Sequence, residues 1–170
     1  MNENTGYVAI EFHEDSQQQV MNWSRQIKAD DLVTANINGK IKGGNVTGKL
    51  HLTLFYGLDE NHLDQVNLAN LITKLDILSV DIVDTGMFPA KEFDCNVLYF
   101  SVSDEFGKLQ SAFEQLKQFS HFANHQNDNF RPHITIAYVT EGFNQSLLTT
   151  EYPRQLKVKQ VTHFKKSQEP

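Results

Sequence analysis

Apolar residues recur along this chain with two different periods, and these periods predict a mixture of helices and strands. Phe106, Leu109 and Phe113 repeat at intervals of three and four, which is the spacing of one helix face. Short runs rich in β-branched and aromatic residues are typical of strands, and Gly57 and Pro89 are expected to end two of them. The pattern predicts helices at 15–29, 61–75 and 104–119. It predicts strands at 7–12, 50–56, 97–102, 132–139 and 155–164, and one strand that includes 77–83 and 87–88. Loops are expected at 121–129 and at 30–48, the latter with a short strand near 33–37.

Two segments of the chain share one plan of strand, helix, loop and strand. The first spans about 6–56 and the second about 97–139, and each ends in a strand that contains the pattern His-x-Thr. Only two copies exist and their loops differ, so the pattern indicates a duplicated supersecondary unit and not a repeat array. We therefore expect residues 1–170 to form a single α+β domain in which two pseudo-repeats pack around a central cleft.

The two His-x-Thr patterns carry the candidate chemistry. Side chains two apart in a strand point to the same face, so His51 and Thr53 project together, and His133 and Thr135 do the same. Only these two of the seven histidines have Thr or Ser two places on, and both lie in matching apolar strands. The other face of each strand is expected to be core, and we assign to it Leu52, Leu54, Ile134, Ile136, Tyr56 and Tyr138.

These residue types suit the cleavage of a phosphodiester. The reaction needs a base, an acid, and hydrogen-bond donors for the non-bridging oxygens. Histidine serves as base or acid near neutral pH, and threonine supplies a short, stiff hydroxyl donor. The two motifs therefore predict proton transfer by His51 and His133, with Thr53 and Thr135 as donors and no metal or cofactor.

Three further residues are candidates for contact with substrate. Phe55 shares the expected face of Thr53 and could stack on a base, although aromatic residues in strands more often pack in cores. Arg131, just before the second motif, could pair with a phosphate or lie on the surface. Tyr7, at the start of the first strand, is the third candidate.

The remaining histidines and the cysteine give weaker signals. His121 and His125 could form a zinc site with His133, contact substrate from their loop, or lie on the surface, and the surface interpretation is favoured. His13, His62 and His163 lie at element ends or on polar stretches, so we expect them to be exposed. The single cysteine, Cys95, excludes an intrachain disulfide and receives no role.

Composition and motif context exclude several other functions. The segment 43–49 matches Gly-x-x-x-x-Gly-Lys, but Leu50 follows it and a strand, not a helix, is expected next, so it is not a phosphate-binding loop. A net charge of −6 argues against binding long nucleic acid and leaves a small anionic substrate open. No apolar run is long enough to span a membrane, and we expect a cytoplasmic protein.

The two hexapeptides, 51–56 and 133–138, resemble the signature of the 2H phosphoesterase superfamily, which is two H-x-[ST] motifs on apolar strands. The resemblance extends over most of 6–139 and implies a bilobal α+β fold with a central cleft. It also implies that His51, Thr53, His133 and Thr135 are the catalytic set and act without metal. Within the superfamily, the chain looks most like phage anti-CBASS nucleases and, less closely, 2′-5′ RNA ligases that act as cyclic phosphodiesterases.

The expected function is cleavage of a cyclic nucleotide or short cyclic oligonucleotide, such as a host immune signal. The alternatives are a 2′,3′-cyclic phosphodiesterase or 2′-5′ linkage-processing enzyme on RNA ends, and a binding module that sequesters a nucleotide without cleaving it. Two complete His-x-Thr motifs favour an enzyme, because a binding module needs no pair of proton-transfer groups.

Overall fold

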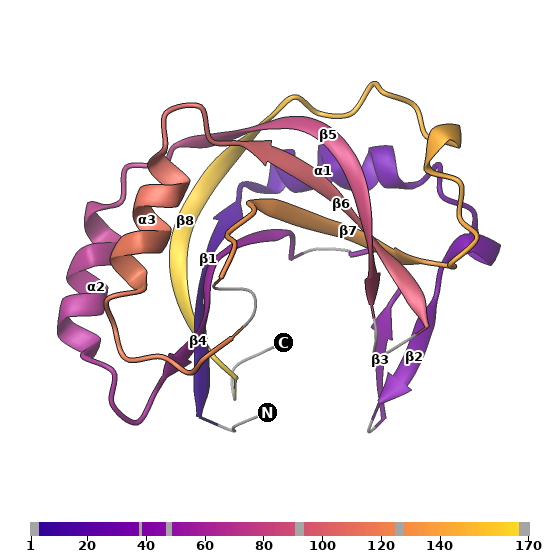
Figure 1. Cartoon of the computed structure of the whole chain (residues 1–170). Helices are drawn as coiled ribbons and strands as arrows, with labels where there is room; N and C mark the ends of the chain where they lie inside the picture. Colours follow the sequence, from indigo (N-terminus) through magenta and orange to yellow (C-terminus); the bar gives the residue numbers. More distant parts are fainter. Residues whose placement is uncertain (1–3, 38, 47–48, 91–93, 125–127, 167–170) are drawn as a thin grey trace.

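The computed structural model describes residues 4–37, 39–46, 49–90, 94–124 and 128–166. Six strands form one antiparallel sheet in the order β4-β1-β8-β5-β6-β7, and β2 and β3 form a separate hairpin (Figure 1). The strands are β1 (Thr5–Phe12), β2 (Thr34–Ile37), β3 (Lys40–Gly43), β4 (His51–Asp59), β5 (Ser79–Ala90), β6 (Cys95–Ser103), β7 (His133–Val139) and β8 (Gln155–Lys165). The helices are α1 (Glu14–Ser24), α2 (Gln65–Lys74) and α3 (Lys108–Leu116), with the short 3₁₀ helices η1 (Ala29–Asp31) and η3 (Gln145–Leu147).

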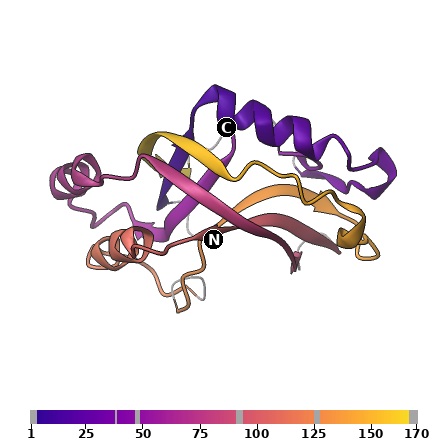
Figure 2. The same ribbon diagram turned by 90° about the horizontal axis from the view of Figure 1, so that it is seen from above.

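The strand order is symmetric about the contact between β8 and β5. β1 leads into α1 and pairs with β4, while β6 leads into α3 and pairs with β7. The chain therefore has two halves, each with a His-x-Thr strand at an outer edge of the sheet. Figure 2 shows α2 and α3 together at one end of the sheet and α1 beside the other end.

The helices connect the two halves, because α1 and α3 each pack on strands of the other half. α1 follows β1 and contacts β8 of its own half, but it also contacts β7 of the other half, and the Trp23 ring lies 5.0 Å from the Phe100 ring of β6. The indole nitrogen of Trp23 donates to the carbonyl of Thr149, 3.2 Å away. α3 follows β6 but contacts β4, where the rings of Phe113 and Phe55 lie 5.6 Å apart. Each half thus buries apolar surface against a helix from the other.

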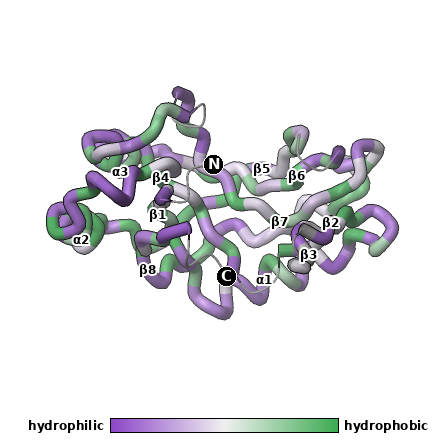
Figure 3. Tube along the Cα trace, turned by 90° about the horizontal axis from the view of Figure 1, so that it is seen from below, coloured by the Kyte–Doolittle hydropathy of each residue, from purple (hydrophilic) through white to green (hydrophobic). Residues whose placement is uncertain are grey.

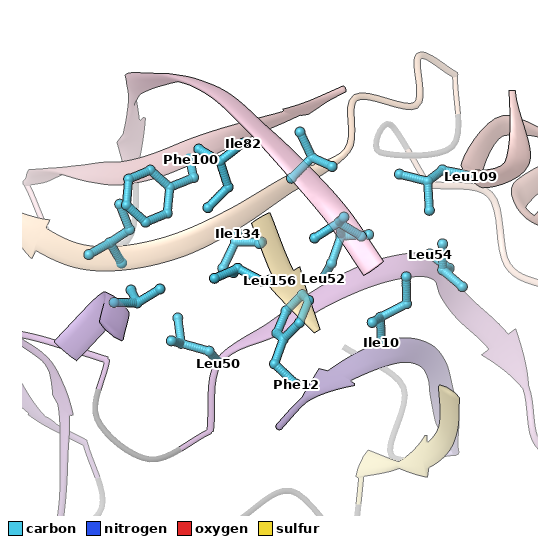
Figure 4. Close-up of a cluster of buried hydrophobic side chains, with 14 of the residues drawn as sticks. Ile10, Phe12, Leu50, Leu52, Leu54, Ile82, Phe100, Leu109, Ile134 and Leu156 are labelled. Carbon is cyan, nitrogen blue, oxygen red and sulfur yellow. The ribbon is translucent and has the colours of Figure 1, made fainter. Parts of the chain in front are cut away.

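One hydrophobic core underlies both motifs. Leu52 and Ile134, the middle residues of the two His-x-Thr patterns, are fully buried and belong to the same cluster (Figure 4). β4 and β7 are the two edges of the sheet, yet they contact each other, because the sheet curls. Figure 3 shows how hydrophobic and hydrophilic stretches alternate along the strands. The shared core therefore holds the two motifs close together.

Two strands run past the residues that were expected to end them. β4 continues through Gly57 to Asp59, because Gly57 has a φ of +99° and forms an unpaired bulge between Tyr56 and Leu58. Such a φ is accessible to glycine at little cost. β5 continues through Pro89, which still pairs with Asn96, to Ala90, so the prediction that Pro89 ends this strand is wrong.

The third helix is shorter than its apolar spacing predicted. The Asp104 carboxylate accepts from the backbone N–H groups of Leu109 and Gln110, at 2.9 and 2.8 Å, which satisfies donors of the first helical turn. α3 consequently begins at Lys108, and Phe106 lies outside it with 85% of its surface exposed. Phe106 was expected on the core face, and that expectation is wrong.

A segment outside the sheet covers its β7 edge. The carbonyl of Tyr138 accepts from Val33, and its N–H donates to Gly44, both at 2.9 Å, so the base of the β2–β3 hairpin lines β7. The predicted loop at 30–48 therefore includes a hairpin. β4 begins two residues after Lys49, so the glycine-rich segment is followed by a strand, as expected, and not by a phosphate-binding helix. Within the described ranges, no helix is both long and apolar enough to cross a membrane.

Candidate active site

The side chains of the two His-x-Thr motifs lie on the same face of the six-stranded sheet, which we call the site face. Directly opposite residues on neighbouring strands share a face, and the pairing is continuous from β4 to β7. Leu52 and Ile134 are buried on the opposite face, while Thr53 and Thr135 are half-buried. His51 is exposed and His133 is half-buried. The structure thus brings the four predicted residues to one face of two strands that contact each other.

The two imidazoles are oriented by the same hydrogen bond in both halves. Nδ1 of His51 lies 3.2 Å from the carbonyl oxygen of Lys49, and Nδ1 of His133 lies 2.8 Å from that of Arg131. A carbonyl oxygen only accepts, so Nδ1 of each ring must carry the proton. Nε2 of each histidine is therefore the atom left to take up or release a proton during a reaction.

Each motif is followed by a bulge, and the two bulges occupy the same position. Thr53 pairs with Ala9 and Phe55 with Val8, which leaves Leu54 without a partner residue in β1. Ile136 is skipped in the same way between β7 and β6. A bulge inserts one residue and reverses the alternation of side chains beyond it.

Because of the bulges, three predictions about which face of the sheet a side chain occupies are wrong. Phe55 was expected beside Thr53, but it is 1% exposed and packs against Phe113 and His121 on the core side. It cannot stack on a substrate base from there. Tyr56 and Tyr138 were expected in the core, but both are half-buried on the site face. Sequence alternation missed them, because a bulge depends on the neighbouring strand.

Aromatic rings surround both histidines. The Tyr7 ring lies 6.2 Å from the rings of His51 and Tyr56, and it stacks on Phe164 of β8 at 5.0 Å and 19°. On the other side, the Tyr99 and Phe88 rings lie edge-on to the His133 ring, at 5.5 and 5.7 Å. Tyr7 was a predicted contact. Phe164, Tyr99 and Phe88 were missed, since only strand register places them there.

The residues beside the histidines differ between the halves. Glu11 lies opposite His51, whereas Ser101 lies opposite His133. Ala9 lies opposite Thr53, whereas Tyr99 lies opposite Thr135. The two histidines therefore share a backbone arrangement but have different polar and aromatic neighbours.

The other sequence candidates occupy less central positions. Arg131 is exposed, its Nε and Nη2 both lie 3.2 Å from the Asn129 side-chain oxygen, and its carbonyl orients His133. His121 bonds the carbonyl of Phe119 through Nδ1 at 2.8 Å, and His125 lies outside the described residues. The side chains that the structure describes contain no group of three potential metal ligands.

The remaining histidines and Cys95 lie away from the motifs. The side chain of His62 is 75% exposed, as expected, and its Nδ1 lies 2.7 Å from Asp59. His163 was also expected to be exposed, but its side chain is only 14% exposed and forms an ion pair with Glu60. Burial, with the charges of nearby Asp94 and Glu141, raises the pKa of the Cys95 thiol.

The structure is an α+β fold that brings its two His-x-Thr motifs to one face of a six-stranded sheet. No protein-family model matches the sequence, and no curated protein matches it. Among solved structures, the chain is similar to Escherichia coli LigT in complex with phosphate, with a TM-score of 0.60 and 17% identity over 94% of this chain and 85% of that one.

Two further structures have the same fold. Kluyveromyces marxianus Usb1 with uridine monophosphate matches with a TM-score of 0.61 and 10% identity, covering 97% of this chain and 95% of that one. E. coli LigT with 3′-AMP matches with a TM-score of 0.55 and 16% identity, covering 95% and 87%. The α+β fold predicted from the 2H phosphoesterase resemblance is therefore confirmed.

Proposed function

We propose that this protein is a phosphodiesterase in which His51 and His133 act as general base and general acid. The observation that supports this most directly is the matched geometry of the two motifs. Both histidines lie on the site face, and each ring donates its Nδ1 proton to the carbonyl two residues earlier. That bond leaves Nε2 of both rings for proton transfer, which is what acid–base catalysis on one phosphate requires.

The proposed reaction balances with these groups alone. One Nε2 takes the proton from the attacking hydroxyl, which is either a 2′-hydroxyl of the substrate or a water molecule, as its oxygen bonds to phosphorus. The other Nε2 gives a proton to the leaving oxygen as its bond to phosphorus breaks. The hydroxyls of Thr53 and Thr135 donate to the non-bridging oxygens, where negative charge increases in the transition state.

The proposed substrate is a cyclic nucleotide or a short cyclic oligonucleotide, such as a host immune signal. Solved structures with this fold hold phosphate, 3′-AMP and uridine monophosphate, which supports a small nucleotide ligand. A net charge of −6 disfavours long nucleic acid. The 3′-AMP bound to LigT favours a second candidate, which is cleavage of 2′,3′-cyclic or 2′-5′ linkages at RNA ends.

A substrate panel tests the proposal. The purified chain is incubated in excess EDTA with 2′,3′-cyclic mononucleotides, 2′-5′ oligoadenylate and 3′-5′ cyclic oligonucleotides, and products are separated by chromatography. We expect a cleavage product from one class, and no product from the variant that carries both His51→Ala and His133→Ala. Activity lost in EDTA and restored by a divalent ion would contradict a metal-free mechanism. Ligands that bind and return unchanged would identify a binding module.

The pH dependence gives a second test. One imidazole must be neutral and the other protonated, so kcat/KM should depend on pH as a bell-shaped curve. A profile that rises steadily to about pH 10 would instead implicate lysine or hydroxide.

A further inference from the structure

A pocket of about 520 Å³ opens beside His51, and the proposed mechanism assigns no role to it. Its walls come from β1, α1, β4 and β8, and His51 itself lines it together with Tyr7, Glu11, Lys49, Lys159 and Phe164. Pockets that bind small molecules are commonly about 300 to 1,000 Å³ in volume. A ligand in this pocket would therefore contact the imidazole directly while leaving the second motif free.

One wall of the pocket is aromatic. Tyr7 and Phe164 lie opposite each other on β1 and β8, and their rings are stacked at 5.0 Å. Both side chains are half-buried, so each keeps part of its surface accessible. Flat aromatic side chains of this kind are the usual stacking partners of nucleobases.

Glu11 provides a fixed acceptor in the same pocket. Its Oε2 accepts from Thr162 Oγ1 at 2.6 Å and from Gln160 Nε2 at 2.7 Å. Two donors on one oxygen hold the carboxylate in place, and no described residue donates to Oε1. An ionised carboxylate oxygen accepts two hydrogen bonds and donates none. Oε1 is therefore suited to a ligand edge that presents two adjacent N–H donors.

The pocket carries charges of both signs, because two lysines line it together with Glu11 and Glu14. Lys49 and Lys159 are exposed and line it, and the carbonyl of Lys49 orients the His51 ring. Ammonium groups attract phosphate oxygens, so these lysines favour an anionic ligand despite the negative charge of the whole chain. Aromatic stacking, an N–H acceptor and ammonium groups together match a nucleotide and not an isolated phosphate.

We propose that this pocket binds a second nucleoside of the substrate and that Glu11 selects guanine there, through the N1–H and 2-amino donors of the base. This inference rests on the proposed phosphodiesterase function. The scissile phosphate lies at the two His-x-Thr motifs, and the guanosine lies on the His51 side of it. The preferred substrate is then at least a dinucleotide, cyclic or linear, and not a cyclic mononucleotide.

The test compares guanosine with inosine, which lacks only the 2-amino group. The purified full chain is assayed on GpA, IpA, ApG and ApI, in the linkage that the wild-type protein cleaves fastest. We expect kcat/KM for guanosine to exceed that for inosine by about 10-fold or more at one of the two positions, because inosine keeps the N1–H donor but has lost the second donor to Oε1. In Glu11→Gln this preference should fall towards equality.

The controls separate base recognition from other effects. Glu105→Gln makes the same charge change at an exposed residue that does not line the pocket, and it should keep the guanosine preference. If Glu11 acted only by positioning His51, Glu11→Gln would lower both rates equally and the ratio would persist, which overturns the inference. Cleavage by the wild type with no preference at either position overturns it too, without any variant. Absence of all phosphodiester cleavage would instead refute the proposed function.

Discussion

The two halves of the molecule have the same backbone arrangement at the motif but different neighbours around it. Both have a histidine at the start of an edge strand, a ring bond to the carbonyl two residues back, and a bulge directly after the threonine. The neighbours are Glu11 and Ala9 in the first half, and Ser101 and Tyr99 in the second. In the proposed mechanism, the shared ring bond leaves Nε2 of each histidine for proton transfer.

The residues that differ between the two halves are the ones that would distinguish the substrate from similar molecules. The first half has a pocket with a carboxylate, while in the second half two aromatic rings stand edge-on to the histidine. Tyr99 also needs space, which Gly86 provides, because a Cβ at Gly86 would lie 2.5 Å from the Tyr99 ring. The backbone arrangement at the motif is thus common to the two halves, whereas the residues around it differ.

The largest expected effect comes from removing either histidine. His51→Ala and His133→Ala should each lower kcat/KM by about 10² to 10⁴, because general acid or base catalysis contributes that much. The double variant should lose far less than the product, since both groups act in one transition state. Steady-state kinetics on the best substrate measures this. Full activity in either single variant would show that the histidine of that half takes no part in proton transfer.

The threonines should show a smaller effect. Thr53→Val and Thr135→Val keep the shape and remove one donor each, so a loss of about 10 to 10³ in kcat is expected. Unchanged unfolding transitions in these variants would confirm that the loss is catalytic. If only one of the two substitutions lowered kcat, the phosphate would be held by one half alone.

Substitution of one glycine in each half by alanine tests how tightly the two halves are packed. A Cβ at Gly6 would clash with Glu60 Oε1, and a Cβ at Gly86 would meet the Tyr99 ring. Gly6→Ala and Gly86→Ala should each lower the free energy of unfolding by about 1 to 3 kcal/mol, the usual cost of overpacking. Urea denaturation measures the change.

Gly142 supplies the matched control, because a Cβ there has no described neighbour within 4 Å. Gly142→Ala should stay within about 1 kcal/mol of the wild type. For the second half, Gly86→Ala should cost little when Tyr99→Ala is also present, since the clash is then removed. A full cost in that double variant would place the strain elsewhere than at the Tyr99 ring.

The smallest effect is expected from the tyrosines that the bulges turn to the site face. Tyr56→Phe and Tyr138→Phe each remove one hydroxyl, and a loss of one hydrogen bond predicts at most about a 10-fold decrease in kcat/KM. Kinetics on the same substrate provides the measurement, and the unfolding midpoint serves as the control. A decrease as large as that of the histidine variants would mean that a tyrosine hydroxyl takes part in proton transfer.

The sequence alone determined the elements and the four central residues of the candidate site. Helical spacing located all three helices within several residues, and alternation over three positions placed each histidine with its threonine on one face. These properties are local, because helix spacing and strand alternation depend on residues a few positions apart. The α+β fold was expected from the resemblance of the two motifs to a known family, and the comparisons with solved structures confirm that fold.

Only the tertiary structure decided which residues surround that centre. Phe55 faces the core and Tyr56 the site because Leu54 bulges against β1, and bulging depends on a pairing partner more than forty residues away in sequence. Glu11, Phe164 and Tyr99 reach the histidines through strand register, and the two edges of the sheet meet because one core lies beneath both. Register and curvature are set by packing between distant segments, which a pattern read along one strand does not contain.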